Sequence, residues 1–151
     1  MTGRKVVASN RKARFNYEIL DTFEAGMVLL GSEVKSLRAG QAQLKDAYAD
    51  IRGGEVWLTN AHISPYQFAE NGGHEPERPR KLLLHRREIE RLFARIREEG
   101  LTLVPIQIYF KEGKAKVELG LGKGKKSHDK RQSIVERQQK REMARAQSHR
   151  R

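Results

Sequence analysis

YADIRGGEVWL, residues 48–58, carries the strongest fold signal in this sequence. Two short stretches that suit β-strands, Tyr48–Ile51 and Val56–Leu58, flank the pair Gly53-Gly54. Glycines readily adopt the positive φ values that a tight two-residue turn between antiparallel strands requires. The stretch therefore predicts a β-hairpin and indicates a protein built mainly from short antiparallel strands.

A second hairpin is predicted near the C-terminal end of the same region. Leu103–Phe110 and Lys114–Leu121 flank Glu112-Gly113. In the second of these stretches apolar residues alternate with lysine and glutamate, the period of two typical of a half-buried strand. Pro105 indicates an edge or a bulge, because proline cannot donate a ladder hydrogen bond.

Two further strands are predicted in the N-terminal part. Phe15, Tyr17 and Ile19 alternate with polar residues, and the apolar run Met27–Leu30 is the expected partner of that strand. We interpret Tyr17 as a residue of the core.

Two helices are expected to interrupt the strands. Ser32 is expected to cap a short helix that ends at Gly40, with Lys35 and Arg38 on its outer face. Its inward residues are Val34 and Leu37. A longer helix ending at Gly100 is indicated by apolar residues spaced i, i+3, i+4 and i+7, which are Ile89, Leu92, Phe93 and Ile96.

Six strands with two or three helices predict a mainly β protein, an antiparallel barrel of the OB type. That architecture closes its sheet edges and commonly binds oligonucleotides. We expect the barrel to occupy residues 1–121, with about the first ten residues flexible, and a basic tail to occupy residues 122–151. Residues 64–80 contain three of the four prolines and predict a long loop.

Positive charge is concentrated in the tail. The chain has 31 Lys and Arg against 19 Asp and Glu, a net charge of +12. Residues 122–151 have 11 basic and 3 acidic side chains, so +8 of this excess lies there. Such a charge attracts polyanions, with nucleic acid as the first candidate and anionic membrane as the second. The tail has too few apolar residues to form a core but many helix formers. We expect it to be disordered when free and helical when bound to a polyanion, although a merely solubilising tail fits the composition equally well.

Several classes of function are disfavoured by what the sequence lacks. There is no cysteine, which excludes disulfides, thiol nucleophiles and cysteine-based metal sites. The five histidines lack the spacing of a helical zinc site. Asp46 and Asp50 would lie about 13 Å apart on one face of a strand, so solvated carboxylates are favoured over a metal-dependent nuclease. The glycine–lysine run at residues 120–126 lacks the spacing of a P-loop.

We therefore expect a binding protein rather than an enzyme, without cofactor or metal. No apolar stretch suits a signal peptide or a membrane span. These features favour a monomeric cytoplasmic protein that does not interact with membranes.

Mixtures of basic and aromatic residues indicate RNA contacts. Asn10, Arg11, Lys12 and Arg14 lead into Phe15, and such mixtures supply phosphate contacts and stacking platforms. A second basic run precedes Leu82. For the arginines of the longer helix we favour another interpretation, in which they form the solvated face of an amphipathic helix and do not contact RNA.

Four segments in order resemble the SsrA-binding protein family, also called small protein B. They are Asn10–Arg14 with Phe23–Gly26, Gly31–Gly40, Arg80–His85, and Gly122–Lys126 with His128–Arg131. The resemblance spans about residues 6–131, and the basic tail also fits. Its one clear departure is Phe15-Asn16, where many members have a histidine followed by an acid. A phenylalanine ring can still stack, but it cannot make the hydrogen bond of a histidine.

The resemblance implies an OB-fold protein that binds the tRNA-like domain of transfer-messenger RNA and delivers it to stalled ribosomes for trans-translation. It also implies contact, through the RNA, with the elongation factor that delivers aminoacyl-tRNA. The tail would lie in the empty mRNA path as a helix, with His128 near the decoding bases.

Combining family positions with basic clusters gives the expected sites. The expected RNA-binding residues are Asn10, Arg11, Lys12, Arg14, Phe15, Glu24, Lys35, Arg38, Arg80, Lys81, Leu83, His85, Lys123, Gly124, Lys125 and Lys126. The expected ribosome-binding residues of the tail are His128, Asp129, Lys130 and Arg131, and Gly124 also matches a family position tied to the ribosome. From barrel and charge alone, a structural ribosomal protein or an initiation-factor-like barrel is an equal alternative, and an enzyme comes third.

Overall fold

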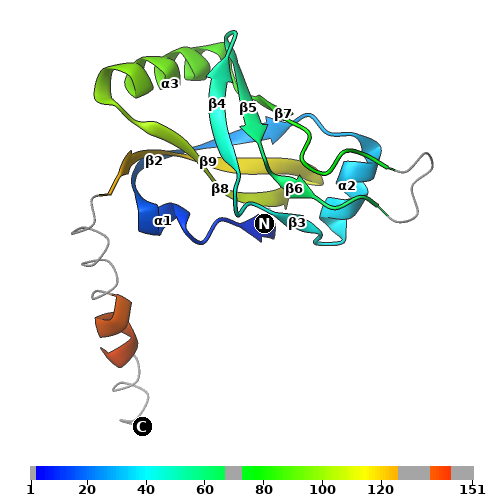
Figure 1. The fold of residues 1–151 in the computed structure, drawn as a ribbon, viewed down its shortest axis with the longest axis horizontal. Helices are drawn as coiled ribbons and strands as arrows, with labels where there is room; N and C mark the ends of the chain where they lie inside the picture. The colour runs from blue at the N-terminus through cyan, green and yellow to red at the C-terminus, as the bar shows by residue number, and fades with distance from the viewer. Residues whose placement is uncertain (1–2, 67–72, 126–136, 144–151) are drawn as a thin grey trace.

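The computed structural model describes residues 3–66, 73–125 and 137–143 (Figure 1). Its strands are β1 (Lys5–Ser9), β2 (Tyr17–Met27), β3 (Ala42–Gln43), β4 (Tyr48–Arg52), β5 (Glu55–Thr59), β6 (His62–Ile63), β7 (Arg80–Leu83), β8 (Thr102–Lys111) and β9 (Lys114–Gly124). The labelled helices are α1 (Ala13–Asn16), α2 (Gly31–Arg38) and α3 (Arg86–Glu99). Residues 137–143 are also helical.

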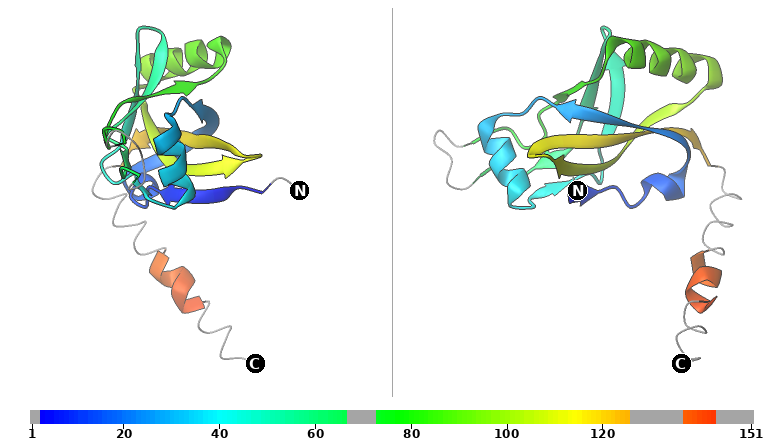
Figure 2. Two further views of the ribbon diagram at one scale, coloured as in Figure 1. Left: turned by 90° about the vertical axis from the view of Figure 1, so that its right-hand side faces the viewer. Right: turned by 180° about the vertical axis from the view of Figure 1, so that it is seen from behind.

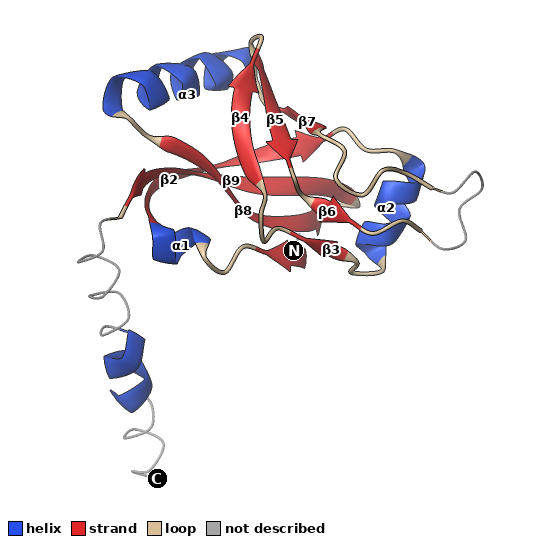
Figure 3. Cartoon of the chain, in the orientation of Figure 1, coloured by secondary structure: helices blue, strands red, loops and turns tan. Residues whose placement is uncertain are grey.

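Seven strands form one antiparallel sheet in the order β1-β8-β9-β2-β7-β5-β4, and β3 pairs with β6 in a small second sheet. The large sheet curls, so that β4 packs against β8 and the β3 strand lies beside β1 (Figures 1 and 3). The enclosed core contains residues from strands throughout the chain, among them Val56, Leu58, Leu82, Ile108, Val117 and Leu119. The mainly β antiparallel architecture predicted from the sequence is confirmed.

Both predicted hairpins are present. Gly53 and Gly54 have φ values of 58° and 77°, and Glu112 and Gly113 have values of 53° and 78°. These turns join β4 to β5 and β8 to β9, whose residues pair in register. The β8–β9 register shifts after Pro105, as expected from a residue that cannot donate to the ladder.

The strand predicted around Phe15 is wrong. Phe15 lies in α1, one turn of helix in which the Asn16 N–H bonds to the Lys12 carbonyl at 2.9 Å. β2 begins only at Tyr17, continues to Met27 and pairs with β9 and β7. Met27–Leu30 is therefore not the partner of an earlier strand, because Met27 ends β2 itself and the next residues lead into α2. Tyr17, expected in the core, is half-buried.

The ends of the folded region also differ from expectation. The first ten residues are not flexible throughout, because Lys5–Ser9 form β1 and pair with β8. β9 continues to Gly124, three residues past the expected boundary at residue 121. β7 follows the predicted loop directly and fills the gap in the sheet between β2 and β5.

The two longer helices lie close to their predicted positions. α2 begins at Gly31 rather than after Ser32, because the Glu33 carboxylate accepts the Leu30 N–H at 2.8 Å. Leu37 is buried, whereas Val34 is half-buried. α3 ends at Gly100, whose φ is 65°. Phe93 has helical core spacing but is 49% exposed, and it lies with Gly53 and Gly54 of the β4–β5 turn along an open groove.

Of the predicted tail, residues 122–125 and 137–143 are described by the structure. We expected the tail to be disordered when free, yet residues 137–143 are helical, with all of their side chains exposed. Glutamine, lysine, arginine and glutamate without glycine or proline favour that helix. Residues 126–136 and 144–151, including the expected cap at Ser133, lie outside the described residues. No described helix has the length and apolar character needed to span a membrane.

Candidate nucleic-acid interface

The outer face of the sheet brings together Glu24 and Leu83, two residues that are 59 positions apart in the sequence. Gly26 of β2 is opposite both Leu83 of β7 and Lys116 of β9. A Cβ atom at Gly26 would lie 3.4 Å from the Leu83 Cβ and 3.9 Å from the Lys116 Nζ. Because side chains two residues apart on a strand share a face, Glu24 points to the same side as this glycine.

We name this region the Glu24–Leu83 surface, formed by Glu24, Gly26, Leu83, Lys111 and Lys116. Leu83 is 53% exposed although it is apolar. The surface therefore offers an apolar contact, two ammonium groups and a carboxylate within a small area, which suits recognition of RNA beyond its phosphates.

The Glu24 carboxylate has a defined set of partners. Its Oε2 accepts the Tyr109 hydroxyl at 2.5 Å, and the Lys111 Nζ lies 3.5 Å away. The hydrogen bond from Tyr109 lowers the pKa of Glu24 below its usual value, helped by Lys111 and Lys116 and opposed by partial burial. Glu24 is therefore ionised at neutral pH.

Arg4 joins the start of the chain to this network. Its guanidinium lies 4.2 Å from the centre of the Tyr109 ring and donates to Glu118 at 2.6 Å. Glu118 also accepts the Gln107 amide at 2.9 Å. No local pattern indicates Arg4 or Tyr109, because Arg4 falls in the segment expected to be flexible, and Tyr109 and Glu118 lie more than 100 residues away from it.

A second group of predicted residues meets at the opposite end of β2. Tyr17 pairs with Gly124, the Lys125 N–H bonds to the Asn16 carbonyl at 2.9 Å, and the Lys125 Nζ bonds to the Arg14 carbonyl at 2.9 Å. The structure thus joins the first and last predicted basic segments in one α1 cluster, whose exposed members are Arg11, Lys12, Arg14 and Lys123. Phe15 lies half-buried within α1.

Asn10 has a structural role beside this cluster. Its amide donates to the Pro105 carbonyl at 3.0 Å, and its N–H bonds to the Ile106 carbonyl at 2.7 Å. Asn10 therefore positions the basic residues that follow it by fixing the end of β1 to β8.

Arg80, predicted to bind RNA, is fully buried. It donates to the Glu33 Oε2 at 2.6 Å and to the carbonyls of Ala61 at 2.5 Å and Pro76 at 3.0 Å. Burial of a guanidinium is tolerated only with such a complete set of partners. The prediction of an RNA contact is wrong for Arg80, which instead joins β7 to α2.

Lys35 and Arg38 are exposed on α2 as predicted, but far from the α1 cluster. The two helices lie at opposite ends of the barrel in both face views (Figures 1 and 2). Lys35 Nζ lies 5.5 Å from the centre of the Tyr66 ring, and the Arg38 guanidinium lies 5.9 Å from that of Phe110. The predicted residues therefore form separate regions rather than one patch.

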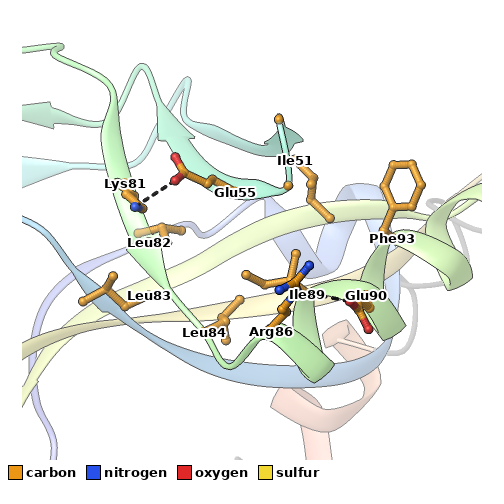
Figure 4. Close-up of a pocket in the computed structure, with 12 residues that line it drawn as sticks. Ile51, Glu55, Lys81, Leu82, Leu83, Leu84, Arg86, Ile89, Glu90 and Phe93 are labelled. Carbon is orange, nitrogen blue, oxygen red and sulfur yellow. Dashed lines mark ion pairs between the residues drawn. The ribbon is translucent and has the colours of Figure 1, made fainter.

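A groove of about 700 Å³ lies between the β4–β5 turn, β7 and α3 (Figure 4). Leu82, Leu84, Ile89 and Phe93 line it. At its rim Lys81 pairs with Glu55 at 2.9 Å and Arg86 with Glu90 at 3.4 Å. His85 precedes α3 and is exposed, while its N–H bonds to Glu88 at 3.2 Å. Lys81, Leu83 and His85 thus lie near one another along β7 and its exit.

The glycines near the end of β9 do not form a phosphate-binding loop. Gly120 and Gly122 belong to the strand and pair with β2. Their missing side chains leave room for Ile106 and Ile19 at Gly120 and for Tyr17 at Gly122. Gly124 has open space beside it.

The remaining predicted residues are Lys126, His128, Asp129, Lys130 and Arg131, and all of them lie outside the described residues. Within the described residues, no three His, Asp or Glu side chains gather to hold a metal ion.

Comparisons with known proteins identify the family. The model of the family described as "SmpB protein" matches residues 7–149. An SsrA-binding protein of Acidothermus cellulolyticus is 61% identical, covering 96% of this chain and 91% of that protein. One from Thermosynechococcus vestitus is 56% identical, covering 97% of both chains. A solved chain described under "tmRNA-SmpB: a journey to the center of the bacterial ribosome" matches with a TM-score of 0.64 and 48% identity, over 83% of this chain and 85% of the other. With a family match over almost its whole length, the chain belongs to the SmpB family of SsrA-binding proteins.

Proposed function

We propose that this chain binds the tRNA-like domain of transfer-messenger RNA and delivers it to stalled ribosomes for trans-translation. The observation that carries the proposal is the match, at 48% identity, to a chain from a structure named for tmRNA, SmpB and the bacterial ribosome. Relatives at 56% and 61% identity are named SsrA-binding proteins, which agrees with the same RNA partner.

The geometry of the outer face supports this role. Lys116 near the exposed Leu83, and Lys111 near Glu24, can each hold a phosphate next to a sugar or base. The ionised Glu24 can accept a hydrogen bond from a hydroxyl or amino group, which a phosphate does not offer. The α1 cluster adds positive charge without such an acceptor, so it suits phosphate contacts alone.

The barrel and the tail have different functions. The barrel binds the RNA, and the tail, including His128 and Asp129–Arg131, enters the empty mRNA path of the ribosome. The protein acts as a monomeric binding protein without catalytic chemistry or a cofactor, and it meets the aminoacyl-tRNA-delivering elongation factor through the shared RNA. Because ribosome rescue takes place where ribosomes translate, we expect it in the cytoplasm.

The proposal is tested first by identifying the RNA that co-purifies with the tagged chain from bacterial cells. Transfer-messenger RNA should be enriched over tRNA. In vitro, a transcript of the tRNA-like domain should bind more tightly than a tRNA of similar length. An RNA pool that matches bulk cellular RNA, together with equal affinities in vitro, would refute the proposal.

A matched pair of variants tests the Glu24–Leu83 surface. Leu83→Ala should weaken binding of the tRNA-like transcript several-fold, because an apolar contact of that size contributes about 1 to 2 kcal/mol. Leu20→Ala removes a leucine of similar exposure, 46% against 53%, from another part of the barrel and should leave the affinity unchanged. Equal effects of the two substitutions would exclude this surface as the site.

A further inference from the structure

Tyr109 of β8 has a fully buried side chain, yet its hydroxyl reaches the outer face of the sheet. The hydroxyl donates to the Glu24 Oε2 at 2.5 Å, while the Arg4 guanidinium lies 4.2 Å from the ring centre. Buried tyrosine hydroxyls require a hydrogen-bond partner, and a charged acceptor gives a strong one. The ring is thus fixed by packing, and it fixes Glu24 in turn.

The contact also determines which oxygen of Glu24 is left free. Oε2 takes the Tyr109 hydroxyl and is the carboxylate atom closest to Lys111, at 3.5 Å, and to Arg4, at 4.0 Å. Within the described residues, Glu24 Oε1 accepts no hydrogen bond. The buried polar atoms that have no partner do not include it, so this oxygen is not enclosed by the protein. Oε1 therefore faces solvent with its acceptor capacity unused.

We infer that Tyr109 is a positioning residue that holds Glu24 so that Oε1 accepts a hydrogen bond from the RNA, donated by a ribose 2′-hydroxyl or a base amino group. The inference rests on the proposed function and names the contact that this surface makes. A carboxylate near RNA repels phosphates, so it favours binding only when it is aimed at a donor.

Two physical effects allow this arrangement of Tyr109 and Glu24 to favour RNA binding. A glutamate side chain has three rotatable bonds, and fixing it before binding removes an entropy cost that the complex would otherwise bear. Arg4, Lys111 and Lys116 surround Glu24 and Glu118, so the local charge is not negative and the RNA backbone can approach.

A double-mutant cycle on RNA affinity tests the inference. Tyr109→Phe keeps the ring and removes only the hydroxyl, and it should weaken binding of the tRNA-like transcript about tenfold. In a Glu24→Ala background the same change should have no further effect, because its target is gone. Tyr48→Phe, at an exposed tyrosine of β4, serves as the control and should bind like the wild type.

A readout without RNA separates positioning from simple stability. In the free protein, the pKa of the Glu24 carboxyl, followed by carbon-13 NMR, should rise in Tyr109→Phe, because the lost hydrogen bond is the main cause of its lowering. Tyr48→Phe should leave that pKa unchanged. Melting temperatures identify any variant whose fold is disturbed.

The outcomes distinguish the inference from the proposed function. Unchanged affinity in Tyr109→Phe, or an equal loss with and without Glu24, would overturn the positioning role even if the wild type binds the transcript selectively. A wild type without selectivity would instead refute the proposed function itself. Transcripts carrying 2′-fluoro groups identify the donor: if they abolish the effect of Glu24→Ala it is a 2′-hydroxyl, and if the effect persists it is a base amino group.

Discussion

At the scale of single residues, a buried carboxylate, that of Glu33, stabilises the barrel. Glu33 of α2 accepts bonds from Arg80 at 2.6 Å and from Arg78 at 2.5 Å, and both Glu33 and Arg80 are fully buried. Burial opposes the charge on Glu33, but the hydrogen bonds from Arg78, the Leu30 N–H and Arg80 outweigh it and lower its pKa. This cluster fixes α2 to the segment that leads into β7.

Removing the charge on Glu33 should destabilise the protein strongly. Glu33→Gln leaves Arg80 buried without its counter-charge, and we expect a loss of about 3 to 5 kcal/mol in urea denaturation at pH 7. Glu55→Gln breaks the exposed pair with Lys81 and should cost under about 1 kcal/mol. Similar losses in the two variants would contradict the role of the buried cluster.

The same carboxyl should make the barrel sensitive to acid. Because the folded state lowers the pKa of Glu33, its contribution is complete above the unfolded value of about 4.3 and is lost as pH falls below it. Stability of the wild type should therefore fall more steeply between about pH 5 and pH 3 than that of Glu33→Gln. Parallel curves of melting temperature against pH would show that other carboxyls dominate.

Residue patterns could not have revealed these roles. Arg80 stands in a basic and apolar run that favours a surface contact, and its partner Glu33 lies 47 positions away. Only the family resemblance indicates Glu24, and its partner Tyr109 lies 85 positions away. Local sequence indicates residue type and spacing, whereas burial of a charge depends on which distant partner the fold supplies.

At the scale of elements, β9 shows why its glycines are needed. A Cβ at Gly120 would lie 2.7 Å from the Ile106 Cδ1 and 3.1 Å from the Ile19 Cγ2, whereas nothing lies within 4 Å of one at Gly124. The side chains of Ile106 and Ile19 therefore pack directly against the backbone in the middle of β9, whereas no side chain packs against Gly124 at its end.

Alanine substitutions in the middle and at the end of β9 should differ in their effect on the free energy of unfolding. Gly120→Ala overpacks the contact with Ile106 and Ile19 and should cost about 1 to 3 kcal/mol in urea denaturation. Gly124→Ala should leave stability within about 0.5 kcal/mol of the wild type. A fully stable Gly120→Ala would mean that the two isoleucines move aside without cost.

The elements that the sequence predicted are those with local signals. The two hairpins have turn glycines between patterned strands, and α3 has its apolar spacing and a terminal glycine. β1 and β7 are short, and each becomes a strand by pairing with residues far along the chain. The alternation around Phe15 spans one helical turn and the start of β2, so it mimicked a single strand.

Loss of β1 should affect both folding and RNA binding. Deleting residues 2–9 removes the ladder with β8 and also Arg4 of the Tyr109 network. We expect a melting temperature several degrees lower and weaker binding of the tRNA-like transcript. Arg4→Gln keeps β1 and should lower only the affinity. A deletion variant as stable as the wild type would show that β1 adds little to the barrel.

At the scale of the whole molecule, the excess charge and the barrel are separate parts. Residues 129–151 have 8 basic and 3 acidic side chains, which account for +5 of the net charge of +12. The core residues, from Ala8 to Leu121, all precede them.

Deleting residues 129–151 should therefore separate RNA binding from ribosome rescue. Affinity for the tRNA-like transcript should survive at moderate salt with a weaker salt dependence, because fewer phosphates are neutralised. Tagging of peptides on stalled ribosomes should fail in a reconstituted translation assay. Full tagging by the truncated chain would mean that the tail is only a solubilising appendage.

β1 and β4 are the two edges of the large sheet. β1 is five residues long, carries a bulge between Val6 and Ala8, and begins with the exposed Lys5. Short, irregular and charged edges discourage other chains from adding strands. The ten-residue β8 behind it is longer and more apolar, and without β1 its backbone groups would be open to a neighbouring molecule. Because β1 covers β8, we expect it to limit self-association and aggregation of the protein at high concentration.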